Sequence, residues 1–259
     1  MPIAAQLTLL GILAAAGFVY YWRLATHLPA PLRPKVDFGK IDIALASVLA
    51  LMIMAQTVQS FSVKTFHVTH EAIMQMIFLN FCVVATIMGV LIGRDRNPLT
   101  LFGLRWPNWR TGIFFAIGSL LAAYPLIFLP VGITNLMGVP SEAQPVVEYL
   151  ATAKGLSERL PMIFMAVVAA PVAEEVIFRG YLHGVLRKWS GRWFSIVATS
   201  LLFSAMHGHI PALVPLFIFA MTLALVYEKT GSLWASLIMH SLFNSVTVVI
   251  ALQWPGLLK

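Results

Sequence analysis

Two adjacent glutamates, Glu174 and Glu175, interrupt an otherwise apolar stretch of the sequence. An ionisable group at the centre of a bilayer costs at least about 2.5 kcal/mol, so such groups are kept for function or are paired with a specific partner. Arg179 lies four residues after Glu175, on the same helical face and in the order that favours an ion pair. Glu174 points about 100° away around the helix and has no partner in its own segment. The Glu175–Arg179 pair could be purely structural, whereas Glu174 is a candidate for chemistry.

Two histidines and one asparagine lie on later apolar segments. His207 follows Phe203 by four residues and His240 precedes Asn244 by four, so each pair shares one helical face. A lone histidine on an apolar helix is usually a packing residue, but two of them with an asparagine and an unpaired glutamate favour a site. With a rise of about 1.5 Å per residue, these residues lie at compatible depths in their helices. We therefore expect four side chains to converge: Glu174, His207, His240 and Asn244.

The residue types point to the activation of a water molecule. The sequence has no G-x-S-x-G nucleophile elbow, and its single cysteine, Cys82, has no histidine at helical spacing. A glutamate such as Glu174 can act as a general base toward water. Imidazole and amide groups can hold that water and polarise the carbonyl of a peptide bond. The predicted chemistry is therefore hydrolysis.

The same residues could instead hold a metal ion. Two histidines and one glutamate form a known catalytic zinc set that leaves one position open for water. If Zn²⁺ is bound, its ligands would be Glu174, His207 and His240. The H-E-x-x-H spacing typical of zinc peptidases is missing, because the string that begins at His70 ends in Met74. The residues leave both a metal-free site and a zinc site open.

Three short motifs occur in order on these segments: E-E-x-x-x-R at 174–179, F-x-x-x-H at 203–207 and H-x-x-x-N at 240–244. Together they resemble the CAAX-processing and bacteriocin-processing (CPBP) intramembrane protease family, which includes the type II CAAX prenyl endopeptidases. The resemblance covers mainly residues 160–252, and the first 110 residues carry no family signature. It implies an all-α fold of about eight membrane helices and cleavage of a peptide bond near the membrane.

The resemblance also implies a role for each motif residue. By position, Glu174 resembles the base that activates water. The residues that hold the water and stabilise the oxyanion would be His207, His240 and Asn244. The residues that orient and support the site would be Glu175, Arg179 and Phe203. Family members are commonly described as metalloproteases, but a metal-independent glutamate mechanism is also argued for the fold, and we favour the latter. The implied substrates are prenylated CAAX proteins or other membrane-associated peptides.

The helices that must carry these side chains are visible in the composition. Hydrophobic residues make up 59% of the 259 residues and charged residues only 10%, compared with about 25% charged in soluble domains. Spanning helices need about 20 mostly apolar residues. Such segments are found near 3–22, 41–61, 72–93, 111–137, 161–186, 193–209, 212–228 and 232–252. The sequence thus predicts an all-α, multi-pass integral membrane protein, in the cell membrane if the source is bacterial, with one membrane domain over 1–259.

The formal net charge of +7 does not indicate a nucleic-acid partner, because the basic residues are spread over short loops rather than gathered in one stripe. Alternate loops carry twelve Lys and Arg residues on one side of the membrane and four on the other. The positive-inside rule then places both termini outside the cytoplasm. Arg23 follows the first segment and no basic residue precedes it, so we interpret that segment as a retained helix rather than a cleaved signal.

Several alternatives stay open. The connection over 138–160 is either an interfacial helix that covers an entrance or a plain surface loop. The leading function is an intramembrane endopeptidase whose partners are the lipid bilayer and a peptide or prenylated protein substrate. A non-catalytic membrane scaffold or a bacteriocin self-immunity protein of the same fold is the main alternative. A proton or ion transporter is a third, which the missing inverted repeat disfavours.

Overall fold

The structure is a computed structural model that describes residues 3–27, 38–62, 68–104, 109–137, 145–153 and 155–254. All eight predicted segments are helical, and the described residues contain no strand. The main helices are α1 (Ile3–Thr26), α2 (Lys40–Ser62), α3 (His70–Ile92), α5 (Trp109–Leu136), a composite helix over 156–190, α10 (Arg192–Met206), α11 (Leu213–Thr230) and α12 (Leu233–Gln253). Seven of these are long and apolar enough to cross a membrane, and α10 is the shorter apolar one. The prediction of an all-α, multi-pass membrane protein is confirmed.

The composite helix is continuous but contains two π-helical parts. It consists of α7 (Leu156–Phe164), the π-helical turn η1 (Met165–Ala169), α8 (Ala170–Glu174), the π-helical stretch η2 (Glu175–Leu182) and α9 (His183–Ser190). The two π-helical parts therefore lie directly before and directly after the short segment that ends in Glu174. Such turns are rare and occur frequently at functional sites.

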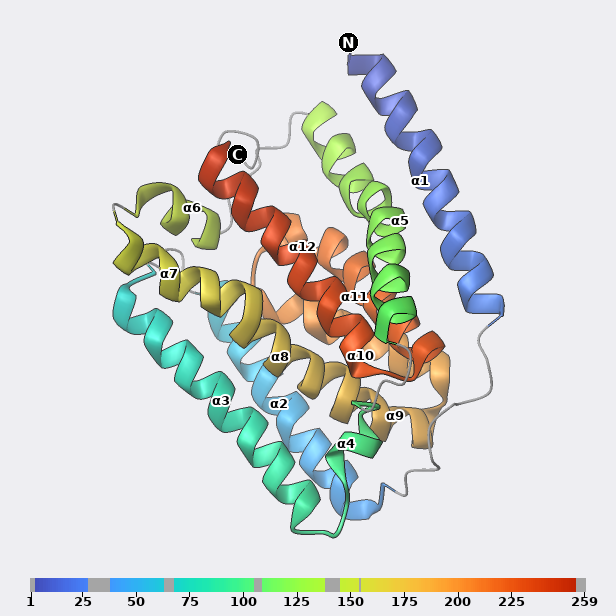
Figure 1. Cartoon of the computed structure of the whole chain (residues 1–259), viewed down its shortest axis with the longest axis vertical. Coiled ribbons are helices and arrows are strands. Elements are labelled where there is room, and N and C mark those ends of the chain that lie inside the picture. The colour runs from blue at the N-terminus through green and yellow to red at the C-terminus, as the bar shows by residue number, and fades with distance from the viewer. Residues whose placement is uncertain are drawn as a thin grey trace.

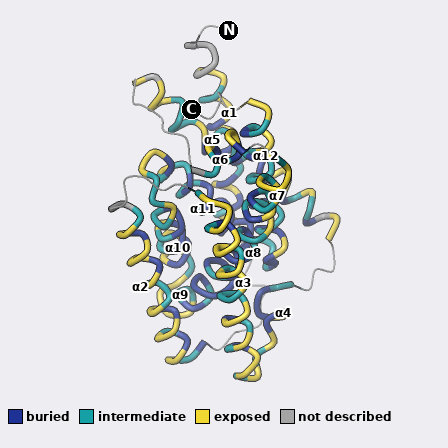
Figure 2. The backbone as a smooth tube through the Cα atoms, turned by 90° about the vertical axis from the view of Figure 1, so that its left-hand side faces the viewer, coloured by how far each residue is buried: buried dark blue, intermediate teal, exposed yellow. Residues whose placement is uncertain are grey.

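The helix α11 is the centre of the bundle. Half of its candidate spanning segment is buried inside the protein, compared with 11% for α3, which lies at the periphery. It packs against α10, α5 and α12, and α12 also packs against the composite helix (Figure 1). Figure 2 shows the same pattern, with buried positions on the inward sides of the helices and exposed ones on the outer sides. Apolar outer faces suit a bundle that is surrounded by lipid.

Three short helical elements complete the described part of the chain, and one of them is the 3-10 turn η3 (Ile210–Ala212) between α10 and α11. The helix α4 (Pro98–Leu101) follows α3, and α6 (Pro145–Thr152) lies in the connection for which an interfacial helix or a loop was predicted. Val147 and Leu150 of α6 are buried with Met162 and Val248, at the end of the bundle where α7 starts and α12 ends. This part of the connection is thus a helix that covers one end of the bundle, while 138–144 and Lys154 lie outside the described residues.

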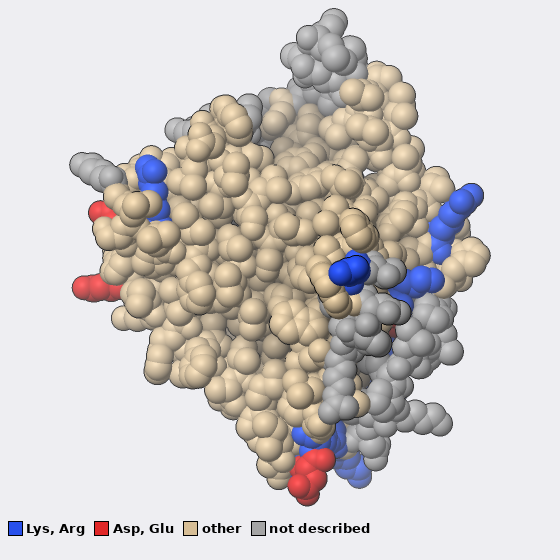
Figure 3. Space-filling view, viewed as in Figure 1, with Lys and Arg blue, Asp and Glu red and all other residues tan. Residues whose placement is uncertain are grey.

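The opposite end of the bundle carries most of the described basic side chains. We call it the basic end, and its residues include Arg23, Lys40, Arg94, Arg96, Arg110, Arg187, Lys188, Arg192 and Lys229. Figure 3 shows charged side chains at the left edge of the view and along its right-hand side and bottom, with a broad uncharged band between them. The band agrees with a membrane-spanning bundle. Residues 28–37 and 105–108 lie outside the described part of the chain, and the orientation of the chain in the membrane stays a prediction.

Candidate active site

The carboxylate of Glu175 connects two buried side chains from different helices. Arg179 donates a hydrogen bond from Nη1 to Oε1 of Glu175 over 2.8 Å, within the composite helix. His240 of α12 places its Nδ1 atom 2.9 Å from the same oxygen. All three side chains are almost fully buried. The i,i+4 pair that the sequence predicts is therefore present, and it has a third member that the spacing does not reveal.

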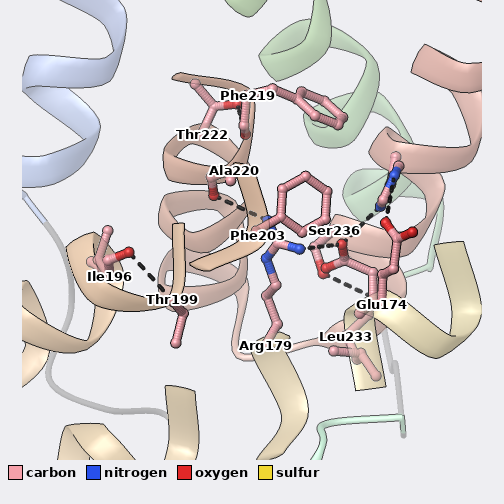
Figure 4. Close-up of polar contacts among 12 residues, drawn as sticks. Glu174, Arg179, Ile196, Thr199, Phe203, Phe219, Ala220, Thr222, Leu233 and Ser236 are labelled. Carbon is pink, nitrogen blue, oxygen red and sulfur yellow. Dashed lines mark hydrogen bonds and ion pairs between the residues drawn. The ribbon is translucent and has the colours of Figure 1, made fainter. Parts of the chain in front are cut away.

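Arg179 extends this contact into the centre of the bundle. Its Nη2 atom donates to the backbone oxygen of Ala220 in α11 over 3.2 Å, and its guanidinium lies 4.7 Å from the ring centre of Phe203 in α10 (Figure 4). Because arginine presents several donors in a rigid plane, one side chain can serve both partners and the aromatic face. Arg179 thus ties the composite helix to α10 and α11.

Glu174 faces the other edge of the His240 ring. Its Oε2 atom is 3.6 Å from Nε2 of His240, and its side chain keeps 13% of its surface exposed. An ionised carboxylate only accepts hydrogen bonds, so the contact with Glu175 assigns a proton to Nδ1 of His240. The imidazole is therefore held between two adjacent glutamates, with Nε2 directed to the more accessible one.

Aromatic rings fix the plane of the His240 ring. The ring of Phe203 lies 5.8 Å from it and that of Phe219 lies 5.3 Å from it, both near perpendicular. Edge-to-face contacts of this kind are favourable and restrict ring rotation. Phe203, which the resemblance implies as a supporting residue, thus contacts both Arg179 and His240. Phe219 and Ala220 are contacts that the motifs do not include.

The two other predicted residues contact different groups. His207, at the end of α10, is exposed, and its Nδ1 atom lies 2.8 Å from the backbone oxygen of Phe203. Asn244 donates from Nδ2 to the backbone oxygen of Ala166 over 2.7 Å. The structure therefore brings Glu174 and His240 together, and it joins His207 to this group through Phe203 rather than by a direct contact with a glutamate.

The predicted zinc ligands do not form a metal-binding group in this arrangement. Within the described ranges, no three His, Cys, Asp or Glu side chains come together in a way that could hold a metal ion. Catalytic zinc needs three protein ligands, and His207 is the one that is not gathered with Glu174 and His240. His70 and Glu71 start α3 on its exposed side, away from this cluster. The residues as placed do not fit a zinc centre.

A known family model matches the part of the chain that carries these side chains. Residues 156–246 match the family model described as "Type II CAAX prenyl endopeptidase Rce1-like". The predicted resemblance is confirmed over these residues. The Rce1-like region starts with α7 and ends within α12, so it contains all seven residues that the motifs single out.

Two curated relatives resemble parts of the chain. The "Putative membrane peptidase YdiL" of Bacillus subtilis (strain 168) is 26% identical over 36% of this chain and 38% of its own length. The "Uncharacterized 24.3 kDa protein" of Escherichia coli is 25% identical over 50% of this chain and 59% of its own length. The matches thus span less than two thirds of either relative. No solved structure gives a significant match.

Proposed function

We propose that this membrane protein is an intramembrane endopeptidase that hydrolyses a peptide bond with a water molecule activated by Glu174. The observation that carries the proposal is the placement of His240 between Glu174 and Glu175, inside a region similar to type II CAAX prenyl endopeptidases. A buried ion pair alone would need only Glu175 and Arg179. The second glutamate and the oriented imidazole add the groups that water activation requires.

Glu174 and His240 would hold the attacking water between them. Their facing atoms are 3.6 Å apart, so a water beside them can lie within about 2.8 Å of each, which is a normal hydrogen-bond distance. The water would donate one hydrogen to Oε2 of Glu174 and the other to Nε2 of His240. A lone pair of the water oxygen would attack the carbonyl carbon while Glu174 takes the proton directed at it, and Glu174 would later give this proton to the leaving amine.

His207 would face the substrate from the end of α10. Its Nδ1 atom already contacts the Phe203 backbone oxygen, which favours a proton on that nitrogen. When the ring carries a second proton, Nε2 can donate to the oxygen of the scissile carbonyl as negative charge develops there. The exposure of His207 supports this role, because a group that contacts substrate must be accessible.

The proposed substrate is a membrane-associated peptide, for which prenylated CAAX proteins are the first class to test. The name of the Bacillus subtilis relative states a membrane peptidase, and the family model states a prenyl endopeptidase. Both support a peptide bond near the bilayer as the target. A hydrophobic anchor on the substrate would keep that bond close to a site formed by transmembrane helices.

The test is cleavage by the purified protein in detergent or liposomes, with quenched prenyl-peptides and an unmodified peptide library. We expect the wild-type protein and a Glu148→Gln control on the exposed face of α6 to cleave at similar rates. Glu174→Gln should lose activity by about 100-fold or more, as expected for a general base. Full cleavage by Glu174→Gln would overturn the mechanism, and a wild-type protein that cleaves nothing would favour the non-catalytic scaffold.

A further inference from the structure

Pro171 interrupts the backbone hydrogen bonds of the composite helix one turn before Glu174. In the π-helical turn η1, the N–H of Ala170 bonds to the backbone oxygen of Met165, five residues earlier. In that register, residue 171 would donate to the backbone oxygen of Ala166. Proline has no N–H, so it cannot make this bond. The Ala166 carbonyl therefore needs a donor from another part of the protein.

Asn244 supplies that donor from α12. Its Nδ2 atom lies 2.7 Å from the backbone oxygen of Ala166, a short contact between residues that are 78 positions apart. A carbonyl without a hydrogen-bond donor is costly inside a bilayer, where water is absent. The side-chain amide of Asn244 thus replaces the backbone N–H that Pro171 lacks, and it joins two helices in doing so.

The same two helices carry the proposed catalytic pair. His240 lies four residues, or about one turn, before Asn244 on α12, and Glu174 lies eight residues after Ala166 on the composite helix. The Asn244–Ala166 bond and the contacts of His240 with the glutamates are two fixed points between these helices. Two points set both the spacing and the axial register of the helices. The bond at Ala166 therefore helps to determine the distance between Glu174 and His240.

We propose that Asn244 is a positioning residue that acts through the Ala166 carbonyl, a role that the resemblance does not imply. The inference rests on the proposed function for its activity readout, but the structural part can be tested without cleavage. The Asn244–Ala166 hydrogen bond replaces the one that Pro171 cannot donate, so Asn244 is needed only while residue 171 is a proline. An oxyanion role would not depend on residue 171.

The experiment is a double-mutant cycle between Pro171→Ala and Asn244→Leu in the full-length protein. The leucine side chain has a size similar to that of asparagine but carries no N–H group. Alanine at 171 returns a backbone N–H to Ala166, from residue 171 in the π-helical register or from Ala170 in the α-helical one. We expect Asn244→Leu alone to lower kcat by about tenfold with little change in KM, because a shift between the two helices would displace Glu174 from His240. In the Pro171→Ala background, the same change should cost less than about threefold.

Two measurements test the role of Asn244 without a cleavage assay. They are backbone hydrogen exchange over residues 161–174 and the thermal unfolding midpoint. Asn244→Leu should speed exchange and lower the midpoint in the wild-type background, and both effects should shrink in the Pro171→Ala background. Ser245→Ala is the matched control, because the Ser245 hydroxyl bonds only within α12, to the backbone oxygen of Ser241. Equal effects of Asn244→Leu in the two backgrounds would overturn the proposal. If the wild-type protein does not cleave, the proposed function fails, and the exchange cycle still decides the role of Asn244.

Discussion

The Nδ1 atom of His240 lies 2.9 Å from the same Glu175 oxygen that accepts a hydrogen bond from Arg179. This relationship joins the E-E-x-x-x-R motif to the H-x-x-x-N motif across two helices. It gives the Glu175–Arg179 pair more than an architectural role, because the pair also sets the proton position and the orientation of the His240 ring. The two adjacent glutamates therefore act on opposite edges of one imidazole.

Glu175→Gln should impair both folding and cleavage. The change removes a buried negative charge and leaves the Arg179 guanidinium without its partner, and breaking such a pair costs about 3 to 5 kcal/mol. The Gln amide can also present an N–H to Nδ1 of His240 and turn the ring. We expect a lower thermal midpoint and a kcat reduced by about 100-fold, because a turned His240 ring no longer holds the attacking water in place. An unchanged midpoint with full activity would contradict the proposed contact.

Glu174→Gln should behave differently, because the Glu174 side chain keeps 13% of its surface exposed, whereas that of Glu175 is fully buried. We expect an unfolding free energy within about 0.5 kcal/mol of the wild type, as for substitutions away from packed networks. Cleavage should nevertheless be lost. Thermal unfolding measured on the same preparations as the cleavage assay separates the two glutamates. A loss of stability as large as that of Glu175→Gln would assign Glu174 to the structural ion-pair network instead.

Arg179→Lys tests the reach of the guanidinium. A lysine ammonium can approach Glu175, but it cannot also serve the Ala220 carbonyl and lie flat over the Phe203 ring. We expect a stability loss of about 1 to 3 kcal/mol from the unsatisfied carbonyl and the lost stacking. Activity should fall less than in Glu175→Gln, because the carboxylate that orients His240 keeps a positive partner. Denaturant or thermal titration in detergent, combined with kcat, measures both effects.

Glu228→Gln at the basic end should reduce stability without changing the chemistry. The Glu228 carboxylate is 2.7 Å from Nε2 of His183 and 3.1 Å from both Arg187 and Arg192, so it joins α9, α10 and α11. We expect a loss of about 2 kcal/mol or more on removal of the buried charge. The kcat of the folded protein should stay within about twofold of the wild type, because none of these groups touches the proposed water site. A selective loss of kcat at unchanged stability would contradict this assignment.

The helices could be predicted from the sequence because long apolar runs are a direct consequence of the bilayer thickness. The contacts at the site could be predicted only in part. Spacing within one helix indicated Glu175 with Arg179, and depth made Glu174 and His240 compatible. Nothing in the sequence indicated that Glu175 contacts His240, because the two residues are 65 positions apart and the side on which α12 packs depends on the whole bundle.

The winding of the composite helix limited the prediction further. Depths and faces were predicted for a regular α-helix, whereas η1 and η2 add residues per turn on both sides of Glu174. The expected convergence of four side chains is therefore seen directly for Glu174 and His240, while His207 reaches them through Phe203 and Asn244 bonds to Ala166. In the sequence, the local signal of this irregularity is Pro171, because a proline within an apolar helix interrupts the backbone hydrogen bonds.

Treatment with a chelator tests whether cleavage needs a bound metal ion. Glu174 and His240 face one another at 3.6 Å, but His207 uses its Nδ1 atom at the Phe203 carbonyl, and Nδ1 of His240 is engaged by Glu175. Only two of the three ligands that catalytic zinc needs are thus close together. We expect protein treated with a strong chelator and desalted to keep its cleavage rate within about twofold, since a general-base mechanism needs no metal. Metal analysis of the same sample should show far less than one zinc per chain. A different result would contradict this prediction: the chelator abolishes cleavage, only Zn²⁺ restores it, and Zn²⁺ does not restore it in His207→Ala. That result would show that His207 moves to complete a zinc site.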